Sequence, residues 1–328
     1  MQPRLFLFGA ALAAMLAAAP AASGQARTQT AFDLVRLDVS ARAAALGGPA
    51  ALSAGDPATT FANPAFLSSE ASGALALGYT NLIGDVNAGS VVIARDLRSS
   101  GISLAGGVRY LSYGEFERRA SSDPTSTADG TFSASEAAVT IAASKEVVPQ
   151  LRLGVAAHAL FASIDEAGAQ AVAGDIGLSY QVPSQGITFG ASVHHVGAVL
   201  SSLGAESDRL PLDVRLTVTN KLRYLPLTVS VAAIDLQRFE GPASDSSFVN
   251  RALDHVAIGG EFQLGSTFAV RAGYNGRRGE DLRSGGRLDL AGVSVGAGVA
   301  LRRIGVDYTY SNWGDFGGLH QFGVRTRL

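Results

Sequence analysis

A regular alternation of apolar and polar residues, repeated along most of the chain, limits this sequence more than any other feature. In GVSVGAGVALRR, Val293, Val295, Ala297 and Val299 fall on one side, and serine and glycine fall on the other. The same two-residue period returns in DVRLTVTN, DIGLSYQV and HVAIGGEFQL. Because successive side chains of a strand point to opposite faces, this period predicts β-strands with one apolar and one polar face.

The number and length of these segments favour a membrane barrel. Many of them reach the roughly 9–11 residues that a tilted strand needs to cross a bilayer, whereas strands in soluble proteins average about five or six. A soluble sandwich would turn the apolar face to its core, and a barrel would turn it to lipid. Strand length, an even strand count and an apolar leader together predict an all-β fold, an about 14-stranded antiparallel transmembrane β-barrel whose last segment pairs with the first. The expected strands lie at 72–82, 88–97, 100–116, 131–147, 150–164, 170–183, 186–197, 211–223, 226–238, 254–265, 267–278, 288–301, 303–311 and 319–328.

Residues 1–26 have the three parts of a secretory signal peptide. Arg4 supplies the positive charge, Leu5 to Ala19 form the apolar region, and AASGQA provides small residues for cleavage after Gly24 or Ala26. The alternative is an N-terminal membrane anchor, but the uncharged run is short for the roughly 20 residues of a spanning helix. We therefore expect export and cleavage.

Composition excludes several classes of function. The net charge is −2, and the 26 basic residues are scattered, so no surface for nucleic acid is expected. The chain has no cysteine, which excludes disulfides, thiolate metal sites and lipid attachment to an N-terminal cysteine.

The usual constellations of catalytic or metal-ligating residues are not recognisable. His194 and His195 are neighbours in a predicted strand, so they are expected to point to opposite faces and not to hold one metal ion. GVSVG at 292–296 matches a nucleophile-elbow pattern but lies inside a strand, where the required turn is missing. The acidic pairs Asp165–Glu166 and Glu280–Asp281 fall in polar turns. We expect no catalytic residues, no metal site, no cofactor and no enzymatic activity.

Residues 27–70 do not alternate and form a separate segment before the barrel. Ser40 is a candidate N-cap, Ala41 to Leu46 a short helix, and Gly47 with Gly48 its end. Turns are expected at Asp56–Pro57 and Asn63–Pro64. The segment is too small for its own core, whereas a fourteen-stranded barrel is too wide to fill with its own side chains. We therefore expect 27–70 to be a hatch inside the barrel of 71–328, with Arg42 pairing with an inward carboxylate such as Asp213 or Glu261; the alternative is a cap at the barrel mouth.

The same segment carries a family resemblance. SARAAALGG at 40–48 and DPATTFANPAFL at 56–67 resemble the opening of the PorV/PorQ family, relatives of the FadL fatty-acid transporters. YTNLIGDVNAGSVVIARDL, GGVRYLSYGEF, GTFSASEAA and RAGYNGRR extend the resemblance into the barrel, where it is closer to the PorQ branch. The residues that carry the hatch motif are Ala41, Arg42, Ala44, Gly47, Gly48, Asn63, Pro64 and Ala65.

The resemblance implies a FadL-like barrel of the outer membrane, in contact with its lipid, that acts in type IX secretion. It also implies partners similar to PorU, PorV and PorZ, which attach proteins with C-terminal sorting domains to the cell surface. The partners would meet the long loops at 117–130, 198–210, 239–253 and 277–288. The alternative function is a FadL-like channel for hydrophobic small molecules, because a fold does not fix a function.

Overall fold

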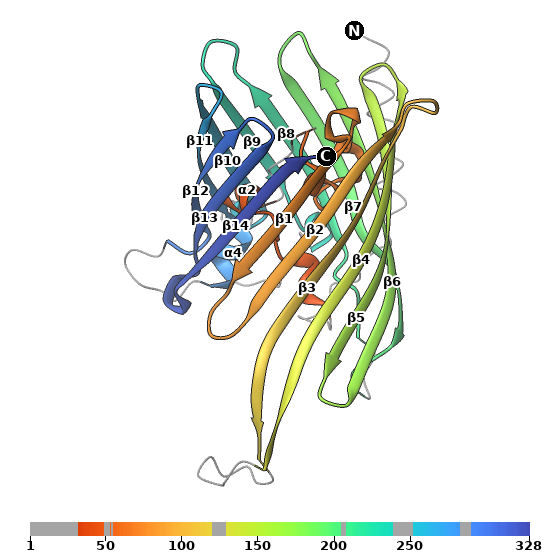
Figure 1. The fold of residues 1–328 in the computed structure, drawn as a ribbon, viewed down its shortest axis with the longest axis vertical. Helices are drawn as coiled ribbons and strands as arrows, with labels where there is room; N and C mark the ends of the chain where they lie inside the picture. The colour runs from red at the N-terminus through yellow and green to blue at the C-terminus, as the bar shows by residue number, and fades with distance from the viewer. Residues whose placement is uncertain are drawn as a thin grey trace.

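The computed structural model of the chain describes residues 32–48, 53, 55–119, 129–204, 208–238, 252–282 and 290–328. Fourteen antiparallel strands form a closed barrel in which each strand pairs with the next and β14 pairs with β1 (Figure 1). The predicted fold class and the closure by the last strand are confirmed. The predicted signal peptide at 1–26, together with 27–31, lies outside the described residues.

The strands are long, and two of them reach well beyond the others. β3 and β4 extend past the rest of the barrel as one projecting hairpin (Figure 1). The bounds are β1 Ala74–Asn81, β2 Asn87–Leu97, β3 Ile102–Arg118, β4 Gly130–Val148, β5 Leu151–Ile164, β6 Ala167–Val182, β7 Ile187–Ser201, β8 Asp213–Lys221, β9 Leu227–Ala233, β10 Val256–Leu264, β11 Phe268–Asn275, β12 Val293–Leu301, β13 Ile304–Asn312 and β14 Gly318–Arg327.

One predicted strand is clearly shorter in the structure than expected. The alternation suggested a strand over 226–238, but β9 ends at Ala233. Asp235 has a positive φ of 52°, which breaks the extended backbone, and a 3₁₀ turn, η5 Leu236–Arg238, follows. The side chain of Asp213 accepts a hydrogen bond from the Asp235 backbone at 2.9 Å and stabilises this bend.

The two faces of the barrel wall have opposite polarity. Apolar side chains point outward and are exposed, whereas polar side chains point inward and are buried. This is the arrangement of a barrel in lipid and the reverse of a soluble core. Exposed outward residues include Leu77, Val91, Val108, Ile141, Val155, Ile176, Val218, Ile258, Val270, Val295, Val306 and Phe322. Buried inward residues include Thr80, Ser103, Thr140, Ser179, Thr217, Ser230, Ser294, Thr309, Ser311 and Gln321.

The connections at the two ends of the barrel differ in length. We call the end that carries the tight connections 98–101, 149–150, 183–186, 222–226, 265–267 and 302–303 the short-turn rim; it is the upper end in Figure 1. The long connections gather at the opposite end, the long-loop rim, and their portions 120–128, 205–207, 239–251 and 283–289 lie outside the described residues. The acidic pair Glu280–Asp281 was expected in a turn and instead ends a short helix, α4 Gly276–Asp281, which the side chain of Asn275 caps.

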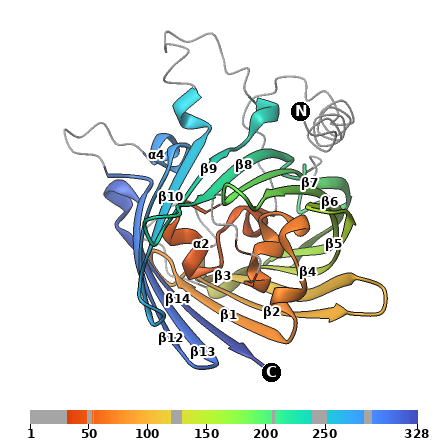
Figure 2. The ribbon, with the colours of Figure 1, turned by 90° about the horizontal axis from the view of Figure 1, so that it is seen from above.

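The described residues before β1 lie inside the ring of strands, as the view down the barrel shows (Figure 2). We call residues 32–48 and 55–71 the luminal segment. Ser40 caps helix α2, and Gly47 and Gly48 end it with positive φ angles of 79° and 81°, as predicted. No helix in the described ranges is long and apolar enough to cross a membrane. The luminal elements are η1 Asp33–Arg36, α2 Ala41–Ala45, η2 Pro57–Phe61, η3 Pro64–Phe66 and η4 Ser69–Ala71.

Candidate luminal binding site

Arg42 attaches helix α2 to the barrel wall. Its guanidinium donates two hydrogen bonds to the carboxylate of Glu261 on β10, at 2.9 and 3.1 Å. Both side chains are buried, so the pair is protected from screening by water. Burial opposes the charge of Arg42, but the adjacent Glu261 more than offsets it and holds the arginine pKa above its ordinary value. Of the two carboxylates expected for Arg42, the structure selects Glu261, because Asp213 pairs with Arg215 at 2.6 Å.

The Arg42 pair continues across the wall as a chain of alternating charges. Arg271 on β11 bridges Glu261 and Asp307 at 2.6 Å each, and Arg325 on β14 reaches Asp307 at 3.0 Å. Each carboxylate therefore lies between two arginines, which neutralises the charge that burial would otherwise penalise. The network joins α2 to strands β10, β11, β13 and β14.

The glycines at the end of α2 let its backbone lie directly against the wall. A Cβ atom on Gly47 would lie 2.7 Å from the backbone oxygen of Tyr274, and one on Gly48 would collide with the carboxylate of Asp38. The Asn275 side chain donates a hydrogen bond to the Gly47 carbonyl at 3.1 Å. The wall has a matching glycine, because a Cβ on Gly273 would run into the α2 backbone, 2.8 Å from the Ala45 oxygen.

The alanines of the predicted motif are packing positions. Ala41 and Ala44 are both buried to about 1 % exposure, and the Ala41 Cβ lies beside Gly323 of the wall. The Thr309 hydroxyl donates a hydrogen bond to the Ala41 carbonyl at 2.5 Å. A larger side chain at Ala41 would separate the helix from the strands.

Asn63, Pro64 and Ala65 attach the second half of the luminal segment to the opposite wall. The Asn63 amide donates hydrogen bonds to the carbonyls of Leu178 at 3.3 Å and Ala191 at 3.1 Å, and its oxygen accepts one from the Ala65 N–H at 2.9 Å. The turn expected at Asn63–Pro64 is therefore the capped start of η3, with Asn63 as N-cap and Pro64 as the first residue. Asp56 and Pro57 start η2 in the same way.

The first residues of the luminal segment fill an apolar part of the lumen toward the long-loop rim. Phe32, Leu34 and Val35 are buried against alanines of strands β2, β4, β5 and β6, and Val199 and Leu210 pack against the same cluster. We call this group the apolar luminal cluster. Glu136 fixes it by accepting hydrogen bonds from the Leu34 N–H at 2.8 Å and from the Tyr113 hydroxyl at 2.6 Å.

A β-bulge brings both neighbouring histidines to the inside of the barrel, so the expectation that they point to opposite faces is wrong. Asp175 on β6 stands opposite both His194 and His195, because the register shifts between Gly174 and Ile176. His195 has a positive φ of 59°, which turns the backbone and changes which residues face inward. Strict alternation cannot reveal such a bulge.

The bulge assembles a buried hydrogen-bonded chain that the sequence did not show. His194 lies 2.8 Å from the Ser192 hydroxyl and 2.9 Å from Asp175, and His158 also contacts Asp175 at 3.0 Å. The histidine thus lies between a serine and an aspartate, as it does in the catalytic triad of serine hydrolases. Ser192, His194 and Asp175 are each at most 3 % exposed. Burial closes the serine to substrate in this conformation, and the chain of bonds stabilises the bulge instead.

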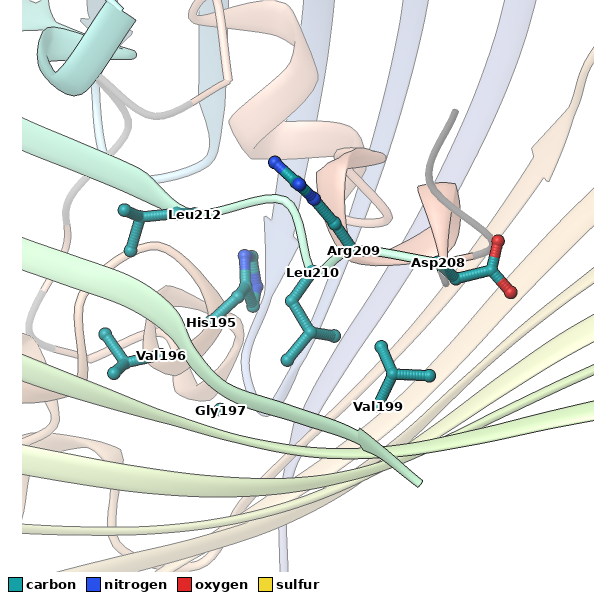
Figure 3. A pocket seen from close by; sticks show the side chains of 8 residues that line it. All are labelled: His195, Val196, Gly197, Val199, Asp208, Arg209, Leu210 and Leu212. Carbon is teal, nitrogen blue, oxygen red and sulfur yellow. The ribbon is translucent and has the colours of Figure 1, made fainter. Parts of the chain in front are cut away.

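A break in the barrel wall lies beside this bulge. β7 pairs with β6 as far as Ser201, but it pairs with β8 only as far as His194. Beyond His194, residues 208–212 run along the free edge of β7 (Figure 3). The His195 imidazole contacts the Pro211 carbonyl at 3.0 Å. Main-chain pairing between the two strands therefore ends seven residues before β7 does.

The break contains a pocket of about 300 Å³. Leu210 projects into it from the 208–212 stretch, toward Val199 of β7 (Figure 3). Two of its lining residues, Val199 and Leu210, also pack on the apolar luminal cluster, and a third, Val196, is exposed. The residues around it are His195, Val196, Gly197, Val199, Asp208, Arg209, Leu210 and Leu212. In the described part of the chain, no three histidine, aspartate or glutamate side chains are placed to hold a metal ion.

Comparison with known proteins identifies the fold and no sequence family. No family model matches the chain, and no curated protein matches it. The toluene transporter TodX of Pseudomonas putida superposes with a TM-score of 0.59 at 14 % identity, over 90 % of this chain and 98 % of that one. A TodX mutant, described as a monoaromatic hydrocarbon channel, gives 0.60 at 14 % identity over the same shares. A FadL homologue of Pseudomonas aeruginosa gives 0.44 at 12 % identity, over 93 % and 97 %. The chain therefore has the closed fourteen-stranded fold of the TodX barrel.

Proposed function

We propose that the chain is an outer-membrane channel that passes small hydrophobic molecules, and that they cross the wall at the break between β7 and β8. The N-terminal 26 residues would direct its export, and the barrel would sit in the outer membrane with its apolar outer face in lipid. The function expected first, a role in type IX secretion, becomes the second candidate.

The continuity of the pocket with apolar surface on both sides carries this proposal. Val199 and Leu210 belong at once to the pocket and to the edge of the apolar luminal cluster, and Val196 beside them is exposed on the outer face. An apolar molecule loses free energy on leaving water, so it partitions along such a path. Ions and sugars would have to give up their hydration to follow it.

The filled lumen argues against a wide aqueous pore. The Arg42 network fixes one half of the luminal segment, and Asn63 fixes the other half against β6 and β7. The likeness in fold to the toluene transporter TodX supports the same class of cargo. Only the fold is shared at 14 % identity, so the cargo is a proposal for this chain.

Uptake of a monoaromatic hydrocarbon tests this function. Purified full-length protein is reconstituted into liposomes, and the entry of radiolabelled toluene and of radiolabelled sucrose is followed. We expect toluene entry well above that of protein-free liposomes and sucrose entry equal to it. A channel that passes sucrose, or one that does not speed toluene entry, contradicts the proposal.

A bulky residue in the pocket identifies the path. Val199→Trp places an indole between β7 and residues 208–212 and is expected to lower toluene entry several-fold. Val306→Trp is the matched control, because Val306 is exposed on the outer face where β13 is paired on both sides. Equal flux in the two variants would show that the cargo does not use the break.

The second candidate, a docking barrel of type IX secretion, rests on the sequence resemblance at 40–48 and 56–67. Its test is deletion of the gene in the native organism, followed by measurement of sorting-domain proteins on the cell surface, with crosslinking from residues of the long-loop rim. Loss of surface display together with capture of PorU-, PorV- or PorZ-like proteins would support it. Normal display with no such capture would remove it.

A further inference from the structure

The short-turn rim carries exposed cations that form no ion pair with another described residue. Some lie in turns, and others lie at the outward-facing ends of strands. By contrast, the luminal arginines Arg42, Arg215 and Arg271 are held by carboxylates. The rim cations are Arg95, Arg98, Lys145, Lys221, Arg223, Arg302 and Arg303.

At the long-loop rim, several arginines form ion pairs with carboxylates. Arg118 pairs with Asp165 and Arg119 with Glu117, so the two neighbouring cations are both neutralised. In α4, Arg277 pairs with Asp235 at 3.3 Å and with Asp281 at 3.0 Å. Part of the positive charge at the long-loop rim is therefore neutralised, although Arg209 and Arg238 there form no ion pair with another described residue, and the cations of the short-turn rim are available to a ligand.

The turn between β12 and β13 is the clearest example. It consists of Arg302 and Arg303, both exposed, between the cross-strand neighbours Leu301 and Ile304. Arg302 has a positive φ of 52°, a conformation that glycine and asparagine adopt far more readily. The sequence thus places a cation, Arg302, where the backbone favours another residue, and a second cation directly after it.

The turn between β8 and β9 repeats this combination of charge and exposed apolar surface. Arg223 is followed by Tyr224, which is 95 % exposed, and by Leu225, which is 55 % exposed. Tyrosine at this position is typical of the boundary between hydrocarbon and water. Arg95 and Lys145 likewise stand at the ends of strands whose outer faces are apolar, so their charged groups can extend past the hydrocarbon to the headgroup layer.

We propose that the short-turn rim binds the phosphate groups of anionic phospholipids, with the Arg302–Arg303 turn as its strongest site. The cations supply charge complementary to the headgroup, and Leu301, Ile304 and Leu225 contact the acyl chains below it. The exposed apolar residues beside the charges select a lipid over an acidic soluble protein, because they face hydrocarbon. Bound lipid would hold this end of the barrel in a phospholipid leaflet.

Native mass spectrometry of the purified full-length protein tests the proposal. The barrel in detergent is titrated with phosphatidylglycerol or with phosphatidylcholine of the same acyl chains, and bound lipids are counted. Arg302→Asn combined with Arg303→Gln removes both charges, and asparagine tolerates the positive φ. We expect the wild type to prefer phosphatidylglycerol and this variant to bind it about tenfold more weakly.

The matched control changes the same charges at the other end: Arg118→Asn combined with Arg119→Gln. It is expected to bind phosphatidylglycerol like the wild type, and excess inorganic phosphate should displace little lipid from any form. Undiminished binding by the Arg302/Arg303 variant overturns the proposal, and so does an equal loss in the control, which would indicate net charge alone. A variant that keeps its lipid but loses binding of an acidic soluble protein would also overturn it. Heat-dependent gel mobility verifies that each barrel is folded.

Discussion

Arg42 and Glu261 lie 219 positions apart in the chain and form a two-pronged, buried ion pair with N–O distances of 2.9 and 3.1 Å. The pair joins the luminal helix to β10, on a part of the inner wall that also carries Arg271 and Asp307. A short helix without its own core is thereby held at a fixed height in the barrel. The break between β7 and β8 lies elsewhere in the wall, so the proposed path for cargo does not require the Arg42–Glu261 pair to open.

Removing the cation should loosen α2 and leave the barrel intact. Arg42→Ala leaves Glu261 with Arg271 but breaks a buried pair, so the opening free energy of α2 should fall by about 3 kcal/mol. Hydrogen exchange at the Ala44 amide, which donates to the Ser40 carbonyl, measures this. The control Arg325→Ala removes a more exposed partner of Asp307. It should lower the opening free energy of α2 by less than about 1 kcal/mol. Equal protection of Ala44 in wild type and Arg42→Ala would show that the pair does not hold the helix.

The contact between Gly273 and the α2 backbone predicts a steric effect. In Gly273→Ala the new methyl group meets the Ala45 oxygen and the Leu46–Gly47 peptide, so α2 must shift or open at a cost of about 1–3 kcal/mol. Gly106→Ala is the matched control in another strand, because a Cβ there meets nothing within 4 Å. Limited proteolysis of 32–48 compares them. The luminal segment should be cleaved faster only in Gly273→Ala, and cleavage at the same rate in both would contradict the contact.

At His195, we expect the positive φ of the backbone to affect the free energy of unfolding more than the contact of the imidazole does. Asparagine accepts a positive φ and valine does not, so His195→Val should be less stable than His195→Asn by about 1–2 kcal/mol. Both variants lose the contact to the Pro211 carbonyl, which isolates the conformational effect. Thermal or denaturant unfolding of the two purified barrels measures the difference. Indistinguishable stabilities would mean that the left-handed conformation costs nothing at this site.

At Asn63, we expect the hydrogen-bond donors of the amide, and not its size, to hold η3 against the wall. Asn63→Asp keeps the size and the acceptor that caps η3, but it replaces a donor to two carbonyls with a carboxylate. The change should free η3 from β6 and β7 at a cost of about 1–3 kcal/mol, measured as faster exchange of the Phe66 amide, which donates to the Asn63 carbonyl. Asn63→Ala loses the same donors without adding charge and should exchange more slowly than Asn63→Asp. The reverse order would contradict the assigned bonds.

The parts of this structure that depend on local pattern follow from the sequence. Successive side chains of a strand face lipid and lumen in turn, which leaves a two-residue period in the sequence. β12 at Val293–Leu301 accordingly falls within the expected 288–301. The cap at Ser40 and the stop at Gly47 and Gly48 depend on neighbouring residues only, and they are also where the sequence predicts them.

Features that depend on pairing between distant segments could not be derived in this way. Asp213 and Glu261 are both inward carboxylates, and only the closed barrel decides which one meets Arg42. The bulge at His194 and His195 does not change the polarity pattern of the sequence, because one histidine can face either the lumen or the outer side of the barrel. The break after His194 depends on where β8 begins, which no local pattern specifies.

The most direct test of the channel is to close and reopen the break in one protein sample. The chain has no cysteine, so Val199→Cys with Leu210→Cys introduces a unique pair that a bifunctional, disulfide-forming linker can bridge. Val306→Cys with Val324→Cys, neighbours across the paired strands β13 and β14, is the control. We predict that linking Val199→Cys/Leu210→Cys lowers toluene entry into liposomes several-fold, that a reductant restores it, and that the control pair changes nothing. Unchanged toluene entry in the linked Val199→Cys/Leu210→Cys protein would contradict passage through this break.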